Sequence, residues 1–129
     1  MSTLLLNTLT GKTSAGSIVV TGEGGSTTTN MQQGLCKVWA KFNGSTFDTS
    51  GDDTFNVTSL TDGGTGEYDI TIANDFASGD HVQLSNSNEL HAINDAANGA
   101  GTLGHGNYNS SHNRADTARQ FVASFGDLA

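Results

Sequence analysis

Hydrophobic and polar residues alternate in short runs along the chain, and glycine, asparagine and aspartate interrupt these runs. Residues 35–42 show the pattern best, because Cys36, Val38, Ala40 and Phe42 alternate with Leu35, Lys37, Trp39 and Lys41. A period of two residues is typical of a β-strand with one buried face. We therefore predict a strand here, with the apolar set toward the core. Trp39 is then expected on a half-exposed face or at an interface, with a core position as the alternative.

Residues 54–73 form the second clear pattern. Phe55 and Val57 begin one alternating run, and Tyr68, Ile70 and Ile72 form another. Between the runs lies the glycine-rich segment 62–66, and glycine supplies the positive φ angles that tight hairpin turns need. This arrangement predicts a β-hairpin.

The rest of the chain after residue 73 carries weaker patterns. Residues 80–85, 90–93 and 116–128 alternate over shorter lengths and predict three further strands. Residues 94–112 are rich in Gly, Asn and Ala, and this composition predicts a long loop that is either functional or mobile. Tyr108 with Asn107, Asn109 and His112 is the one aromatic and amide cluster in this loop, so these four residues are the candidate receptor-binding loop.

The N-terminal residues form a separate pattern. Residues 3–10 and 17–21 are apolar on both faces and predict a small hairpin, which a neighbouring chain would cover because an isolated hairpin is marginal in water. We predict an N-terminal β-arm over residues 1–22, a Gly/Ser/Thr linker over 23–33 and a β-sandwich over 34–129. The expected assembly contacts are Leu4, Leu5, Leu6, Ile18, Val20 and Trp39.

Composition and charge change this picture in three ways. Only 34% of the residues are hydrophobic, which is low for a self-sufficient core and favours stabilisation by partner subunits. The formal net charge of −8 argues against nucleic-acid binding, which needs Lys and Arg at the phosphates. No apolar stretch reaches spanning length and no signal peptide is present, so we expect a soluble protein with no membrane insertion.

Candidate chemistry is sparse. The single cysteine, Cys36, lies in an apolar run and is expected to be a small buried side chain. No nucleophile motif, carboxylate pair or phosphate loop is recognisable, so we expect no enzyme activity, no catalytic residues and no cofactor. The acidic segment with Asp48, Asp52 and Asp53 lacks the spacing of a calcium loop, and the four histidines are expected to be solvated rather than metal ligands.

Three segments resemble a module of tailed bacteriophages from marine and freshwater hosts. They are "KVWAKFNG" at 37–44 with "DTFNVTSLTDGGTGEYDITI" at 53–72, "TLLLNTLTGKTSAGSIVVTGEG" at the N-terminus, and the closing "VASFGDLA". The module is similar to parts of tail-fibre and virion structural proteins. The resemblance implies a β-sandwich that is often trimeric, and it supplies no catalytic residues. Residues 80–116 depart from the usual continuation of the module, which puts any ligand-facing loop in doubt.

These observations predict an all-β protein with a jelly-roll-like antiparallel β-sandwich and a short N-terminal β-arm. The expected function is that of a structural component of a phage virion, made in the cytoplasm of a bacterial host. A tail-fibre or appendage subunit that forms a homotrimer is the first hypothesis. A capsid decoration protein that stabilises the shell is the second, and a module that binds a host surface glycan is the third. The expected partners are copies of the same chain and other tail or capsid proteins.

Overall fold

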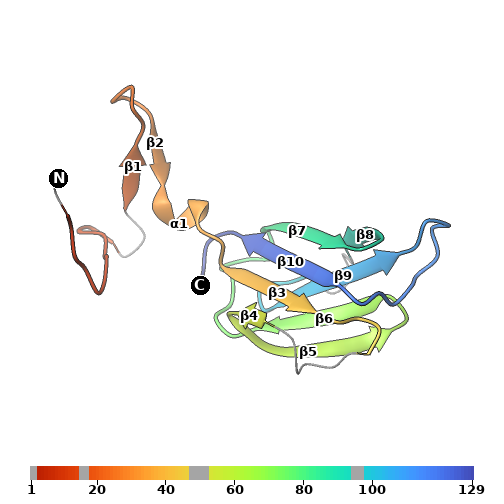
Figure 1. Cartoon of the computed structure of the whole chain (residues 1–129). Coiled ribbons are helices and arrows are strands. Elements are labelled where there is room, and N and C mark those ends of the chain that lie inside the picture. Colours follow the sequence, from red (N-terminus) through yellow and green to blue (C-terminus); the bar gives the residue numbers. More distant parts are fainter. Residues whose placement is uncertain (1–2, 15–17, 47–52, 94–97) are drawn as a thin grey trace. The chain divides into compact units, whose positions relative to one another are not determined.

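The computed structural model describes residues 3–14, 18–46, 53–93 and 98–129. The chain divides into two compact units, Met1–Leu35 and Cys36–Ala129. Figure 1 labels the strands of both units. The model confirms the all-β prediction, because antiparallel sheets account for nearly all of its regular structure.

The first unit contains a two-stranded hairpin of β1 (Val19–Thr21) and β2 (Thr28–Asn30), followed by α1 (Met31–Gly34). Gly25 has a φ of 73° in the turn between the strands. The Oδ1 atom of Asn30 accepts hydrogen bonds from the backbone N–H groups of Gln32 and Gln33, so Asn30 caps the helix.

The predicted strand over residues 3–10 is wrong, because residues 3–14 contain no strand. The partner of β1 lies instead inside the segment predicted as a linker, residues 23–33. The glycines at 22–25 that suggested a linker supply the hairpin turn, and the threonines after them supply a β-branched strand.

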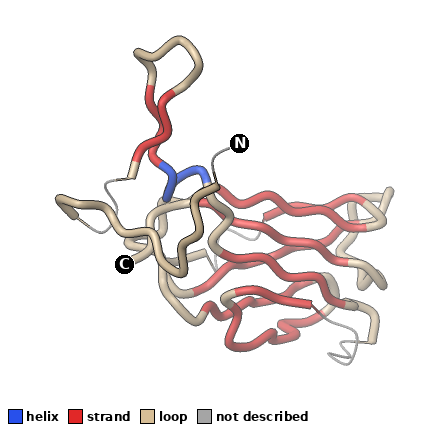
Figure 2. The backbone as a smooth tube through the Cα atoms, turned by 60° about the vertical axis from the view of Figure 1, so that its left-hand side comes forward, coloured by secondary structure: helices blue, strands red, loops and turns tan. Residues whose placement is uncertain are grey.

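The second unit is a sandwich of two four-stranded antiparallel sheets. The first sheet has the order β4-β3-β10-β7, and the second has the order β5-β6-β9-β8. The strands are β3 (Val38–Phe42), β4 (Asp53–Phe55), β5 (Val57–Gly64), β6 (Glu67–Ile72), β7 (Val82–Ser87), β8 (Leu90–Ile93), β9 (Thr102–Tyr108) and β10 (Gln120–Phe125). Figure 2 shows these strands as two stacked layers. The described residues of this unit form eight strands in two sheets, as in a jelly roll. Three pairs of strands that follow one another in the sequence, β3–β4, β5–β6 and β8–β9, are also neighbours within one sheet.

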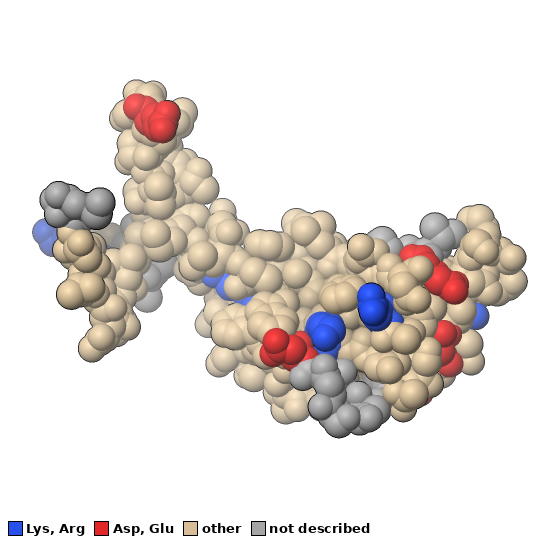
Figure 3. Space-filling model, viewed as in Figure 1, with Lys and Arg blue, Asp and Glu red and all other residues tan. Residues whose placement is uncertain are grey.

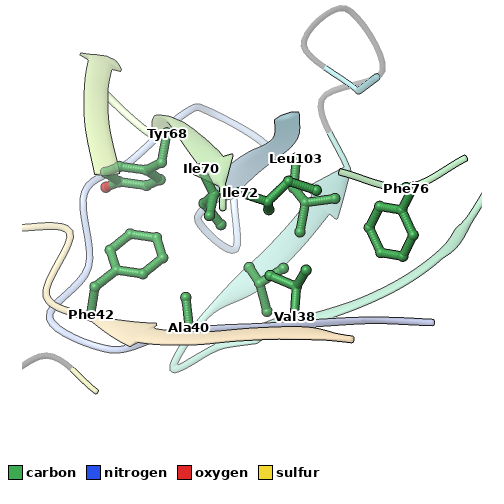
Figure 4. Packing of buried hydrophobic residues seen from close by; sticks show 9 residues of the cluster. Val38, Ala40, Phe42, Tyr68, Ile70, Ile72, Phe76 and Leu103 are labelled. Carbon is green, nitrogen blue, oxygen red and sulfur yellow. The ribbon is translucent and has the colours of Figure 1, made fainter. Parts of the chain in front are cut away.

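The hydrophobic core lies between the two sheets, where side chains from both layers point toward one another (Figure 4). The predicted core face of β3 is confirmed, since Val38, Ala40 and Phe42 are buried. The remaining buried hydrophobic residues are Tyr68, Ile70, Ile72, Phe76, Leu103 and Val122. Their alternation along β6 and β10 gives each strand one inner and one outer face.

The predicted hairpin at residues 54–73 is confirmed for β5 and β6, with Gly64 and Gly66 at positive φ in and beside the turn. The first strand, however, does not run unbroken from residue 55 to residue 60. Asn56 has a φ of 59° and separates β4 in the first sheet from β5 in the second. Its side-chain amide donates to the carbonyl oxygens of Lys37 and Asn74, so hydrogen bonds hold this corner.

The predicted loop over residues 94–112 is wrong in its middle part, because this part forms β9. This strand is the central partner of both β6 and β8, and Leu103, His105 and Asn107 on its inner face are fully buried. Gly104 and Gly106 alternate with these residues. The strand is difficult to recognise in the sequence, because neither the two glycines on one face nor His105 and Asn107 on the other have a high β-propensity.

Candidate functional site

The outer face of the first sheet carries apolar residues from all four strands. Residues that lie opposite one another in neighbouring strands project on the same side of a sheet. The register aligns Phe55, Trp39, Ala123 and Leu84 in one row across β4, β3, β10 and β7. This row lies outside the core, since the residues between them along β3 and β10 are buried.

Two further rows flank the first. Lys41 pairs with Phe121 and with Asp53, and Phe121 pairs in turn with Asn86. On the other side, Phe125 of β10 pairs with Val82 of β7. We call the set Phe55, Trp39, Leu84, Val82, Phe121 and Phe125 the outer apolar face.

Solvent reaches much of this outer apolar face. Val82 is 62% exposed, Leu84 59%, Phe55 52% and Phe121 41%. A groove of about 290 Å³ runs over the sheet and is lined by residues 39–41, 84–86 and 121–123. Monomeric proteins seldom expose contiguous apolar patches of this kind unless the patch binds a partner.

Charge is almost absent from the four strands of the first sheet. Lys41 and Asp53 are the charged residues in β3, β4, β7 and β10, and they lie opposite each other in the register. Figure 3 shows a largely uncharged surface on the sandwich, with basic groups near its middle, an acidic group directly beside one of them and other acidic groups toward one end. In a chain of net charge −8, a nearly neutral surface is where a second negatively charged molecule is repelled least.

The first unit exposes apolar residues as well. Leu4, Leu5 and Leu6, which were predicted as assembly contacts, are exposed, as are Leu9 and Val20. Ile18 is half-buried, and its carbonyl oxygen accepts a hydrogen bond from the N–H of Met31. Trp39, the sixth predicted contact, is half-buried in the second unit and lines the groove. The prediction that Trp39 lies on a half-exposed face is confirmed.

The predicted receptor loop does not form a surface cluster. Asn107 is fully buried on the inner face of β9, where its side-chain amide donates to the carbonyl of Ala115 and its Oδ1 lies 2.6 Å from the hydroxyl of Ser87. This residue binds the following segment, 109–117, to the sandwich. The prediction failed for Asn107 because the sequence does not distinguish an asparagine that hydrogen-bonds to a neighbouring loop from one that hydrogen-bonds to a ligand.

The other three residues of the predicted loop have separate local roles. Tyr108 is half-buried, with the Arg114 guanidinium 5.2 Å from the centre of its ring. The side chain of Asn109 accepts hydrogen bonds from the N–H groups of Ser111 and Asn113 and thereby closes a turn. His112 is exposed in that turn at a φ of 60°. None of these contacts gathers the residues into a binding surface.

A buried polar network lies at one end of the sandwich. The Tyr68 hydroxyl is within hydrogen-bonding distance of the Gly44 carbonyl oxygen, at 3.2 Å, and of an Asp116 carboxylate oxygen, at 3.0 Å. Burial, and then the Asp116 carboxylate, raise the pKa of Tyr68 well above its ordinary value near 10. A Cβ atom at Gly44 would collide with this hydroxyl, so only glycine fits there. The network holds the loops that carry Gly44 and Asp116 against Tyr68, which is fully buried, whereas Asp116 is an exposed residue.

His105 belongs to the same end of the core. It is fully buried, and its Nε2 lies 2.7 Å from the Oε1 of Gln120. Gln120 donates from its Nε2 to the Thr117 carbonyl and hydroxyl oxygens, so its Oε1 is the atom that accepts from the histidine. The expectation of a solvated histidine at this position is therefore wrong. A buried, hydrogen-bonded ring stabilises a unique packing arrangement.

Within residues 3–14, 18–46, 53–93 and 98–129, no three His, Cys, Asp or Glu side chains come together as a metal site would need. Asp48 and Asp52 of the acidic segment lie outside the described residues, and Asp53 begins β4. Among the same described residues, the helical structure is too short and too polar to traverse a bilayer. Cys36 is half-buried, and its Sγ donates to the Val38 carbonyl oxygen.

Sequence reasoning missed most of the outer apolar face. Phe121, Phe125, Leu84 and Val82 were assigned to predicted strands, but the side of the sheet on which each lies was not determined. The pattern that could have identified them is in β10, where Gln120, Val122 and Ser124 alternate with the apolar residues Phe121, Ala123 and Phe125. The buried set there is the more polar one, which reverses the usual rule for a strand.

No family model, curated protein or solved structure matches this chain.

Proposed function

We propose that this chain is a non-enzymatic structural component of a tailed-bacteriophage virion, and that it assembles with copies of itself as a tail-fibre or appendage subunit. The observation that carries the proposal is the outer apolar face of the first sheet. A β-sandwich that leaves aromatic and aliphatic side chains from four strands in water gains stability when a partner covers them. The resemblance of residues 37–44 and 53–72 to phage virion modules supplies the biological setting.

The surrounding chemistry supports an assembly role over a catalytic one. The buried polar groups with described contacts, including His105, Asn107 and Tyr68, bond to other core and loop groups. The groove over the first sheet is lined mainly by carbon atoms, with Lys41 as its charged residue. Such a surface favours binding by burial of apolar area and offers little to polarise a substrate.

The proposal is tested first in solution. Sedimentation equilibrium of the purified full chain should give a homo-oligomer, with a trimer favoured. Phe121→Asp, which adds a negative charge within the groove, should shift the population to monomers. Thr71→Asp, on the exposed outer side of β6 in the second sheet, is the matched control and should leave the oligomer intact. A wild-type chain that stays monomeric at micromolar concentrations would contradict the self-assembly.

The position on the particle requires a second experiment. Antibodies against the chain, applied to purified phage and imaged by electron microscopy, should label the tail. Label spread over the capsid would instead favour the decoration protein, and the added chain should then raise the thermal stability of empty capsids. Binding of the chain to host cells in the absence of phage would favour the glycan-binding module. Label on no part of the particle would contradict a role in the virion.

A further inference from the structure

The chain presents two apolar surfaces that differ in form. The groove in the outer apolar face is concave and is built on a rigid sheet, with Trp39, Leu84 and Phe121 among its lining residues. The segment 3–10 is the opposite kind of element, because it joins no strand and its leucines project into solvent. Leu4 is 79% exposed and Leu5 is 87% exposed.

We infer that segment 3–10 of one copy binds in the groove on the first sheet of a second copy. This inference rests on the proposed function, and it names the element that makes the contact. The assembly it describes is head-to-tail, because each copy gives a segment to one neighbour and receives a segment from another. Such an interface forms rings when the rotation between copies closes.

Charge favours this pairing over other contacts between copies. Segment 3–10 contains no charged residue, although the chain as a whole has a net charge of −8. Within the described strands of the first sheet, Asp53 is the one acidic residue, and Lys41 lies opposite it. The outer face of the second sheet, by contrast, carries Glu67 and Asp69. An apolar segment therefore covers fewer charged side chains on the first sheet, and their desolvation costs less free energy than on the second.

The dimensions agree with the pairing. In an extended segment, Leu5 and Leu9 lie on the same side, and four residues span about 13 Å. The four strands of the first sheet cover about 14 Å from the first to the last, at about 4.8 Å between neighbours. Leucines at the two ends of one segment can therefore reach both edges of the sheet while the chain between them crosses the groove. A groove of about 290 Å³ accepts side chains but no folded element.

The test mixes two full-length variants that each lack one half of the contact. The segment variant carries Leu4→Ser and Leu5→Ser, and the groove variant carries Leu84→Asp. Each variant alone should sediment as a monomer, because neither can both give and receive. A 1:1 mixture should form a complex of two chains, in which the intact segment of the groove variant binds the intact groove of the segment variant. The measured mass should rise from one chain to two.

Other results overturn the inference and separate it from the proposed function. If the segment variant still forms the wild-type oligomer, the segment is not the contact and self-assembly itself survives. If both variants are monomeric and the mixture remains monomeric, the segment and the groove are not the two halves of one contact, and the inference fails. If the wild-type chain is itself a monomer, the proposed self-assembly has failed. Thermal unfolding verifies that each variant is folded, and Leu84→Ser replaces Leu84→Asp where the charged variant does not fold.

Discussion

The two sheets of the sandwich share one core but have opposite outer faces. In the second sheet, the register aligns Ser59, Thr71 and Thr102 in one outer row, and Thr61, Asp69 and Gly104 in the next. The equivalent rows of the first sheet contain Phe55, Trp39, Leu84 and Phe121. Since both sheets fold against the same interior, folding alone does not require this difference. The apolar outer face is therefore consistent with the contact between subunits proposed above.

The largest expected effect is the difference in the free energy of unfolding between a substitution in the core and one on the outer apolar face. Leu103→Ala removes a fully buried side chain of β9 and should lower the free energy of unfolding by about 2–5 kcal/mol. Leu84→Ala, on the outer face of β7, should cost less than about 1 kcal/mol in the monomer, because Leu84 is already largely in water. Urea denaturation at low protein concentration measures both. Equal losses would show that the outer apolar face is part of the folding core.

A smaller effect is expected at the buried end of the second sheet. Tyr68→Phe removes the hydroxyl that bonds to Gly44 and Asp116, and should cost about 1–3 kcal/mol near neutral pH. The raised pKa of Tyr68 means that its contribution is complete below pH 10, where the unfolded chain also keeps the proton. Above pH 10 the unfolded chain ionises while the folded one does not, so this stability is lost.

The difference between wild type and Tyr68→Phe should therefore shrink as the pH rises from 8 to 11. Urea titrations at the two pH values measure it. A difference that stays constant with pH would show that the hydroxyl is ionised equally easily in both states.

A still smaller effect is expected from the charges on the outer face of the second sheet. Glu67 and Arg114 form an ion pair at 2.8 Å, with both side chains about one-third exposed. Glu67→Gln should change the free energy of unfolding by no more than about 1 kcal/mol, and less in high salt. Denaturation at two ionic strengths measures this. A loss of several kcal/mol would mean that this polar face also contributes to the fold, which would weaken the contrast between the sheets.

The last prediction concerns Trp39 fluorescence, which reports on assembly and not on the stability of the fold. Trp39 is the one tryptophan of the chain and lines the groove on the first sheet. Its fluorescence emission should move to shorter wavelength as protein concentration rises, since a partner removes water from the ring. Phe121→Asp should abolish this shift, and Thr71→Asp should preserve it. An emission maximum that is independent of concentration in the wild type would contradict burial of this face.

The sequence was informative where turns and period-two patterns coincide. The Asp62–Gly66 turn located the β5–β6 hairpin, and alternation in β3 located its buried side. The sequence was misleading where local composition resembles that of a loop but contacts distant in sequence decide the structure. β9 has glycines on one face and buried His105 and Asn107 on the other, and it is held by β6 and β8. The hydrogen bonds from these partner strands leave no local pattern in the sequence, because the partners are up to about forty residues away.

The same limit applies to the candidate site. Trp39 could be placed on a half-exposed face from its own strand, but the row that joins it to Leu84 exists only because β10 pairs with both β3 and β7. The receptor loop was predicted from amide and aromatic residues that the structure uses internally. The proposed partner of the outer apolar face has no local signature in the sequence, because the free energy of such a contact depends on two molecules rather than on one chain.

The place of β10 in the first sheet also bears on when the protein can assemble during its synthesis. This strand is the last of the sandwich in chain order, yet it lies between β3 and β7 at the centre of the sheet. Until residues 120–125 leave the ribosome, β3 and β7 have no common partner, and the groove they share with β10 does not exist. Growing chains on one messenger RNA therefore cannot pair through this surface while they are incomplete. In the proposed assembly, subunits therefore pair only after each has folded, which protects against aggregation during translation.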